Sequence, residues 1–179
     1  MAVVETIVVA LWAMLPAYLP NNVAVVAGGG RPIDDGRSWG ERRLLGDGKT
    51  WRGTAVGVGA GALLAVSLNA VRPAGLFGAT PPEFPPTVAV ALPAGAMLGD
   101  IAASFLKRRT GRKRGAAFPV VDQLDFVAGA LAVAAVAAPG WFGGVFTPAV
   151  LLAVVLITPV LHFGTNLIAY LVGLKTEPW

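Results

Sequence analysis

The chain has 179 residues, of which 55% are hydrophobic and only 13% are charged, whereas soluble domains carry about 25% charged residues. With a mean hydropathy of +0.68, this composition excludes a soluble enzyme, a disordered tail and a nucleic-acid-binding domain, despite the net charge of +4. The absence of cysteine also excludes disulfide bonds and thiolate metal sites.

Five stretches are apolar and long enough to suggest transmembrane helices, since a bilayer core needs about 20 residues of helix. They are residues 2–27, 53–71, 88–106, 126–138 and 146–174. The fourth is short for a span, and residues 122–125 or 140–141 would lengthen it. The first carries Glu5 and no basic segment, which is atypical of a cleaved signal peptide. The sequence therefore predicts an all-α integral membrane protein with a single domain over residues 1–179.

The distribution of basic residues predicts the topology. Of the 14 Lys and Arg residues, six lie between the first and second stretches, six lie between the third and fourth, and Lys175 follows the fifth. Only Arg72 falls on the other side. Because basic loops tend to stay in the cytoplasm, we expect both loops and the C-terminus to be cytoplasmic and the N-terminus to lie outside.

The second stretch carries a face of small residues. Gly53, Gly57 and Gly61 lie four apart, and therefore share one side of a helix. This spacing lets a neighbouring helix approach closely, so we expect this face to pack against another span.

Polar residues at the two ends of the first basic loop are candidates for substrate contact. Asn21 and Asn22 follow Pro20, so their amides either satisfy a broken helix or face a site. Lys49 and Thr50 precede a helix N-terminus, where backbone N–H groups favour anions. A polar loop with an N-cap is the alternative, because the segment lacks the glycine spacing of a phosphate-binding P-loop.

Asp100 is the most unusual residue of the third stretch, because a carboxylate inside a span costs about 2.5–3.5 kcal/mol on insertion scales. With Ser104 and Lys107 it follows an i, i+4, i+7 spacing, so the three share one helical face. A structural ion pair with an arginine is the alternative for Asp100. The basic run after Lys107 either continues this site or anchors anionic lipid headgroups. That run contains Arg108, Arg109, Arg112, Lys113 and Arg114.

Asp122 and Asp125 are expected to point the same way at the start of the fourth helix. Two hard oxygen ligands suit Mg²⁺ when it also binds substrate phosphates, and Asp100 could assist them. Helix capping is the alternative, although one aspartate would satisfy it. His162 is the single histidine, and we expect it to be a hydrogen-bonded core residue rather than a ligand.

Together these residues resemble the archaeal CDP-archaeol synthases. The resemblance rests on residues 20–22, 46–53, 99–100, 104–109, 119 and 122–126. The residues Ser104, Lys107, Arg108, Asp122 and Asp125 are also similar to the signature of the broader CDP-diacylglycerol synthase family. Gln123 stands where that family has Arg, and its H-G-G segment is absent, which favours the archaeal branch.

The resemblance implies an Mg²⁺-dependent cytidylyltransferase that converts CTP and 2,3-bis-O-geranylgeranylglycerol 1-phosphate to CDP-archaeol and pyrophosphate. It implies catalytic roles for Lys107, Asp100, Asp122 and Asp125, with the three aspartates as metal ligands. The residues implied in substrate binding are Asn21, Asn22, Asp47, Lys49, Thr50, Arg52, Ser104 and Arg108. It also implies a multi-pass protein of the cell membrane, whose active site faces the cytoplasm, where CTP meets an isoprenoid ether-lipid phosphate held in the bilayer.

Two other functions are considered. A CDP-alcohol phosphotransferase also uses membrane aspartates and Mg²⁺, but its signature needs further aspartates besides the pair at Asp122 and Asp125. A small transporter of lipids or anions, with Asp100 lining its path, is the non-enzymatic alternative.

Overall fold

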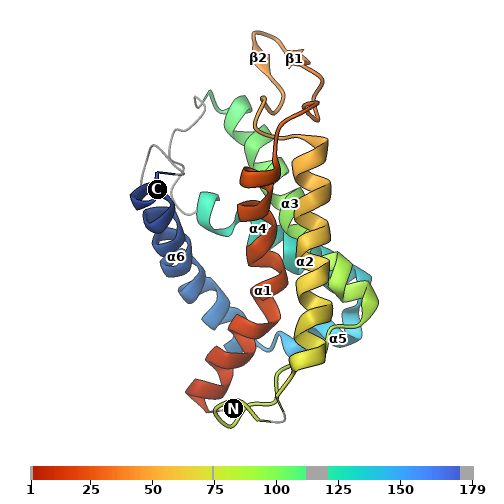
Figure 1. The fold of residues 1–179 in the computed structure, drawn as a ribbon, viewed down its shortest axis with the longest axis vertical. Coiled ribbons are helices and arrows are strands. Elements are labelled where there is room, and N and C mark those ends of the chain that lie inside the picture. Colours follow the sequence, from red (N-terminus) through yellow and green to blue (C-terminus); the bar gives the residue numbers. More distant parts are fainter. Residues whose placement is uncertain (1, 74, 112–120, 174–179) are drawn as a thin grey trace.

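The computed structural model describes residues 2–73, 75–111 and 121–173, and these fold into a helical bundle with a small hairpin at one end (Figure 1). In chain order the elements are α1 (Val3–Ala27), β1 (Ser38–Trp39), β2 (Arg42–Arg43), α2 (Trp51–Val71), α3 (Pro86–Arg109), α4 (Val121–Ala137), α5 (Pro139–Val145) and α6 (Pro148–Leu171). The antiparallel pair β1–β2 is a small departure from the all-α prediction. Residues Arg112, Lys113, Arg114, Pro119 and Lys175 lie outside the described residues.

Four of the described helices, α1, α2, α3 and α6, are long and apolar enough to cross a membrane. The helix α4 has 17 residues, which corresponds to about 25 Å at 1.5 Å per residue. It begins at Val121, so the short fourth stretch is lengthened at its N-terminal side. Gly140 and Trp141 belong instead to the separate short helix α5. Four crossings are thus supported by length and composition, and the fifth stays a prediction for α4.

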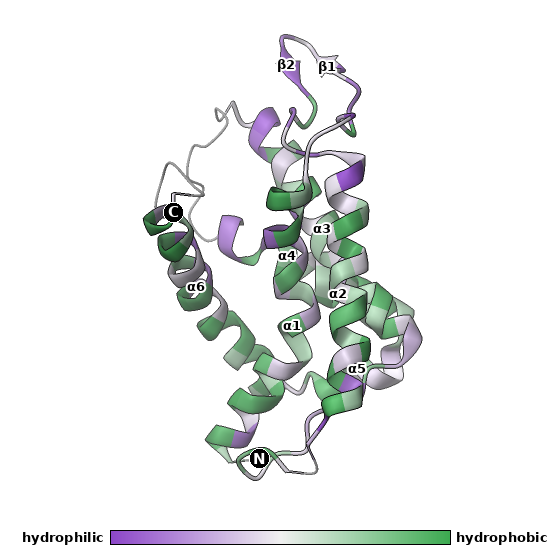
Figure 2. Ribbon diagram, viewed as in Figure 1, coloured by the Kyte–Doolittle hydropathy of each residue, from purple (hydrophilic) through white to green (hydrophobic). Residues whose placement is uncertain are grey.

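The outward surface of the bundle is apolar. Large apolar side chains are exposed along the helices, including Leu63, Val136, Leu152 and Val160, and Val136 is 85% exposed. In Figure 2 the hydrophilic residues gather mainly at the end that carries the hairpin, whereas the helix bodies are hydrophobic. A surface of this kind is costly in water and favourable against lipid.

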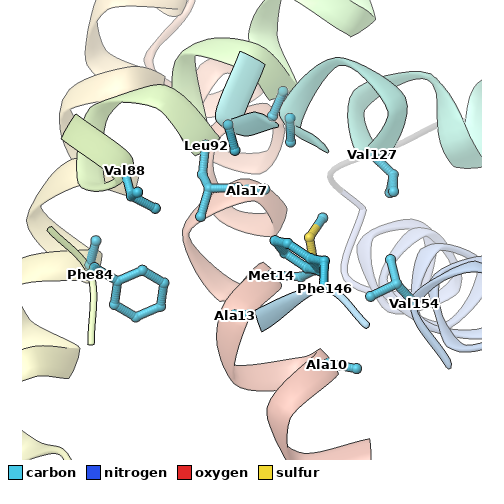
Figure 3. Packing of buried hydrophobic residues seen from close by; sticks show 14 of the residues in the cluster. Ala10, Ala13, Met14, Ala17, Phe84, Val88, Leu92, Val127, Phe146 and Val154 are labelled. Carbon is cyan, nitrogen blue, oxygen red and sulfur yellow. The ribbon is translucent and has the colours of Figure 1, made fainter. Parts of the chain in front are cut away.

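The interior is built largely from small residues. Ala10, Ala13, Met14 and Ala17 of α1 are buried, and α3, α4 and α6 pack larger side chains around them. Figure 3 shows Met14 and Phe146, the C-cap residue that follows α5, among the side chains of this buried cluster. Because alanines leave little side chain between helix axes, the helices approach closely through their backbones.

The glycine face of α2 contacts α1, as the spacing predicted, and the two helices run side by side in Figure 1. A Cβ on Gly57 would lie 2.7 Å from the carbonyl oxygen of Pro20. A Cβ on Gly61 would lie 2.6 Å from the carbonyl oxygen of Pro16 and 2.5 Å from the Cβ of Pro93. These positions therefore have no room for a larger residue.

The pair α3–α4 depends on glycine in the same way. A Cβ on Gly95 would lie 2.5 Å from the carbonyl oxygen of Gly129, and a Cβ on Gly99 would overlap the carbonyl oxygen of Asp125. This contact brings the start of α4 against the part of α3 that carries Asp100.

Asp34 organises the loop between α1 and α2. The residue is only 5% exposed. Its carboxylate accepts hydrogen bonds from Arg43 (Nη2, 2.7 Å; Nε, 3.2 Å) and from the backbone amides of Leu45 (2.9 Å), Gly46 (3.0 Å) and Gly36 (3.2 Å). The Arg43 guanidinium, assisted by these amides, holds the pKa of Asp34 well below its usual range. The ionised carboxylate thus joins the start of the loop to β2 and to the residues that follow it.

We expect Gly61→Ala to destabilise the bundle by about 1–3 kcal/mol, because the added methyl group overlaps two neighbouring helices. Gly59→Ala is the matched control, since nothing lies within 4 Å of a Cβ at that position. This control should be neutral or stabilising by up to about 1 kcal/mol, because alanine favours helix over glycine. Thermal unfolding in detergent measures both, and equal midpoints would contradict the packing described for this face.

We expect Asp34→Asn to open the loop, with an effect that depends on pH. A carboxylate whose folded pKa is depressed stabilises the closed loop fully above its unfolded pKa of about 3.9, and this contribution is lost as the pH falls toward the folded value. Amide hydrogen exchange of residues 44–46, corrected for intrinsic rates, measures opening in both proteins.

The exchange rates of wild type and variant should differ between pH 5 and 7 and converge at lower pH. Asp35→Asn is the control, because Asp35 pairs with Arg31 at the exposed surface, where such pairs contribute about 0–1 kcal/mol. A pH-independent difference for Asp34→Asn would argue against this role of its charge.

Candidate active site

Two lysine–aspartate ion pairs lie at the end of the bundle that carries the loop. Lys49, just before α2, pairs with Asp100 of α3. Lys107, near the C-terminal end of α3, pairs with Asp122 in the first turn of α4. The four side chains are between 21% and 26% exposed. Three segments distant in the sequence therefore meet in one charged cluster.

Asp125 belongs to the same cluster. The charges of Asp100, Asp122 and Lys107 all act on it, and its backbone carbonyl packs against Gly99. Its Oδ1 accepts a hydrogen bond from the amide of the following residue at 2.5 Å. The glycine contact between α3 and α4 thus brings the three predicted ligand carboxylates into one electrostatic neighbourhood.

The partner of Asp100 differs from the alternative considered from the sequence, which was an arginine. Lys107, which shares a helical face with Asp100, reaches across to Asp122 instead. A carboxylate in a poorly solvated position needs a nearby cation, and Lys49 meets this need from the end of the loop.

The expected ligands Asp100, Asp122 and Asp125 do not form a ready metal cage in this arrangement. Within the described ranges, no group of three or more His, Asp or Glu side chains could hold a metal ion as it stands. The physical reason is that lysine ammonium groups pair with two of the three carboxylates. The donor set nevertheless fits a hard divalent cation, because all three donors are carboxylate oxygens.

Hydrogen bonds hold the backbone at and after Lys49 in place. Its amide donates to the carbonyl of Gly46 at 3.2 Å. The hydroxyl of Thr50, which is buried, caps α2 by accepting the amide of Gly53 at 3.1 Å. Arg52 donates through Nε to the last carbonyl of α1 at 2.8 Å. The N-cap alternative is therefore correct for Thr50, and the cap sets the position from which Lys49 reaches Asp100.

The other predicted substrate-binding residues lie around this cluster or on the loop. Asn22 donates to the carbonyl of Tyr18 at 3.1 Å, whereas Asn21 Oδ1 is buried without a hydrogen-bond partner among the described residues. Asp47 is 68% exposed at its side chain and pairs with Arg43 at 2.9 Å. Asn22 and Asp47 thus each contact a residue nearby in the chain. Their roles in substrate binding stay predictions.

On α3, Ser104 is half-buried between the two ion-paired positions of the helix. Arg108 donates through Nε to the carbonyl of Leu45 at 3.3 Å and so contacts the loop. His162 stacks on Phe126, with ring centroids 6.5 Å apart. The histidine thus packs against α4, and it is half-buried rather than in the fully buried core.

Two residues that matter for the site were not singled out from the sequence. Asp34 begins an Asp-Asp-Gly turn, in which Asp35 and Gly36 adopt positive φ values of 49° and 78°. That turn signature was the available signal. Arg109 was assigned only to the basic run, and nothing in the sequence indicates that it contacts the hairpin.

A cavity of about 900 Å³ lies elsewhere, between the loop and the opposite face of α3. Its lining includes Leu98, Ile101 and Phe105 of α3, Trp51 of α2 and Arg31 of the loop. None of the lysine or aspartate side chains of the two ion pairs lines it. The lysines and aspartates to which the sequence assigned catalytic roles therefore lie in the charged cluster and not in this cavity.

Comparison with known proteins identifies the family of this chain. The sequence model of a family described as CarS-like, CDP-archaeol synthase, matches residues 3–179. The CDP-archaeol synthase of Halobacterium salinarum is 66% identical over 181 residues, with all of both chains covered. That of Natronomonas pharaonis is 60% identical, covering 99% of this chain and 100% of its own. That of Methanosarcina mazei is 49% identical, covering 93% and 100%.

A solved structure is also similar, with a TM-score of 0.72 and 38% identity over 89% of this chain and 94% of that chain. It is described as giving structural insight into an intramembrane enzyme for archaeal membrane lipids biosynthesis. The apolar helices and this neighbour indicate a multi-pass membrane protein. The phosphotransferase and transporter alternatives find no support among these relatives. The chain belongs to the CDP-archaeol synthase family, and it is a CTP-dependent cytidylyltransferase of lipid biosynthesis.

Proposed function

We propose that this protein transfers CMP from CTP to 2,3-bis-O-geranylgeranylglycerol 1-phosphate, releasing pyrophosphate and forming CDP-archaeol, at the cluster of Lys49, Asp100, Lys107, Asp122 and Asp125. The observation that carries the assignment is the double ion pair that joins the loop, α3 and α4. These pairs bring together lysine ammonium groups, which can bind phosphate, and carboxylates, which can bind a metal ion. They lie at the polar end of an apolar bundle (Figure 2).

The reaction brings two anions together. An oxygen of the lipid phosphate attacks the α-phosphorus of CTP, and the bond to the departing pyrophosphate breaks. Since a phosphate monoester is already ionised at neutral pH, no general base is required. Catalysis then depends on holding the reactants in line and on neutralising charge. Lys49 and Lys107 supply that neutralisation when they exchange their carboxylate partners for phosphate oxygens.

Enzymes of this kind are typically metal-dependent, and we propose Mg²⁺ as the metal. Asp122 and Asp125 would hold it, with Asp100 assisting, because their oxygens become available as the lysines turn to substrate. The cation supplies further positive charge beside the phosphate oxygens. In the arrangement seen here, each lysine balances the charge of one carboxylate, Lys49 that of Asp100 and Lys107 that of Asp122.

The remaining predicted residues surround this centre. Arg108 and Ser104 continue the α3 face toward the triphosphate, and the segment containing Asp47, Thr50 and Arg52 shapes the loop that carries Lys49. The amides of Asn21 and Asn22 lie in the last two turns of α1, and we propose that they contact substrate.

The proposed topology places the charged cluster at the cytoplasmic surface. Both basic loops face the cytoplasm, the N-terminus lies outside, and α4 makes the fifth crossing. This orientation follows from the asymmetry of Lys and Arg in the loops. It also lets soluble CTP meet a headgroup held in the bilayer.

Asp122→Asn and Asp125→Asn should each reduce turnover at least about a hundredfold, corresponding to about 2.7 kcal/mol of transition-state stabilisation. The amide keeps the shape of the side chain but removes a hard anionic ligand. The assay follows radiolabelled CTP into CDP-linked lipid with purified protein over a range of Mg²⁺ concentrations. Glu41→Gln, at the exposed turn of the hairpin, is the matched control and should keep wild-type turnover.

Near-normal turnover of both aspartate variants would reduce the pair to a helix-capping role. A product in which the headgroup is exchanged rather than CDP-linked would contradict the proposed reaction itself.

A thiol at position 110 should react with membrane-impermeant reagents only from the cytoplasmic side. Thr110 is exposed at the end of α3, and the chain has no cysteine of its own. Thr110→Cys should therefore be labelled in inverted vesicles and protected in intact cells. Thr80→Cys, in the exposed connection before α3, should show the reverse pattern. Labelling of Thr110→Cys in intact cells would contradict the topology.

A further inference from the structure

The guanidinium of Arg109, the last residue of α3, is bound to the hairpin β1–β2. Its Nη1 donates to the carbonyl of Trp39 at 2.9 Å. Its Nη2 donates to the carbonyls of Arg42 at 3.1 Å and Arg43 at 2.9 Å. The guanidinium also lies over two aromatic rings, 5.6 Å from the ring centre of Trp39 and 5.5 Å from that of Phe105.

The hairpin needs such external support. Each strand has only two residues, and an isolated two-stranded hairpin is marginally stable at best in water. A planar guanidinium can bind three carbonyls and stack on aromatic rings at once, whereas a lysine ammonium cannot reproduce this arrangement. The Nη groups of Arg109 therefore donate to protein carbonyls, whereas its buried Nε has no hydrogen-bond partner among the described residues.

The hairpin is connected to Lys49 by an ordered chain of contacts. Arg43 of β2 binds the carboxylate of Asp34, which also accepts the amides of Leu45 and Gly46. The carbonyl of Gly46 accepts the amide of Lys49 at 3.2 Å. A displacement of the hairpin therefore transmits to the residue that pairs with Asp100.

The helix α3 holds the loop through Asp100, Arg108 and Arg109. From this geometry we propose that Arg109 is a positioning residue for the reaction: it fixes the hairpin so that Lys49 is presented to the triphosphate. This role rests on the proposed function of Lys49. It differs from lipid anchoring, because it acts through the loop and not through the membrane surface.

The test compares Arg109→Ala and Arg109→Lys with Arg37→Ala in detergent. Arg37 lies in the same loop, is exposed, and carries the same charge. We expect both Arg109 variants to lower kcat/KM for CTP about tenfold, mainly through KM, since hydrogen bonds to charged groups contribute about this factor. Arg37→Ala should remain within about twofold of wild type. Guanidinium ion at millimolar concentration should partly restore Arg109→Ala and leave Lys49→Ala unchanged.

Limited trypsin cleavage within residues 31–49 provides a readout that is independent of turnover. At the trypsin sites that both variants keep, after Arg42, Arg43 and Lys49, the loop should be cut faster in Arg109→Ala than in Arg37→Ala, while the thermal unfolding midpoints of the two variants agree. A double variant completes the design. In a Lys49→Ala background, Arg109→Ala should add little further loss, because both changes act on the same step.

The outcomes separate the two proposals. If Lys49→Ala is impaired but Arg109→Ala behaves like Arg37→Ala in KM and in cleavage, the positioning role is wrong and the proposed site stands. If Lys49→Ala keeps wild-type turnover, the proposed role of Lys49 fails, and the cleavage rates alone decide whether Arg109 holds the hairpin. A defect of Arg109→Ala seen only in anionic-lipid bilayers and absent in detergent would assign the residue to lipid anchoring and overturn the proposal.

Discussion

The charge of Asp100 is the constraint on which the rest of the polar end depends. A carboxylate within the apolar part of a helix must find a cation, because an unpaired charge in a poorly solvated position is very costly. The cation is Lys49, which is 51 residues away in the sequence. The loop before α2 must therefore be ordered, and the ionised Asp34 and the contacts of α3 with the hairpin provide that order.

The second constraint is steric. The glycines of α3 and α4 remove the side chains that would separate the two helices, so Asp125 lies against the backbone of Gly99. Close approach places several carboxylates in one neighbourhood, and their mutual repulsion must be offset. Lys107 does so by pairing with Asp122 across the helix boundary. Packing of small residues and placement of charge are thus two aspects of one arrangement.

Features set by residues that are near one another in the sequence could be predicted from it, whereas features set by tertiary contacts could not. Apolar stretches and the face of Gly57 and Gly61 are local patterns, so the sequence indicated the spans and their close packing. The shared helical face of Asp100 and Lys107 was also local. Their actual partners are set by tertiary contacts with Lys49 and Asp122, which no spacing encodes. The loop has no periodicity, so only its turn residues gave a signal.

Arginine and lysine residues have different roles at the polar end of the bundle. Arg43 and Arg109 bind carboxylate and carbonyl oxygens through several donors of a rigid fork, which suits permanent structural contacts. Lys49 and Lys107 each contact a single carboxylate with a point charge on a flexible stem. An ammonium group can leave one oxygen for another without breaking a bidentate geometry. Arginine therefore suits the frame of this site, and lysine suits a step in which phosphate must replace carboxylate and later depart as pyrophosphate.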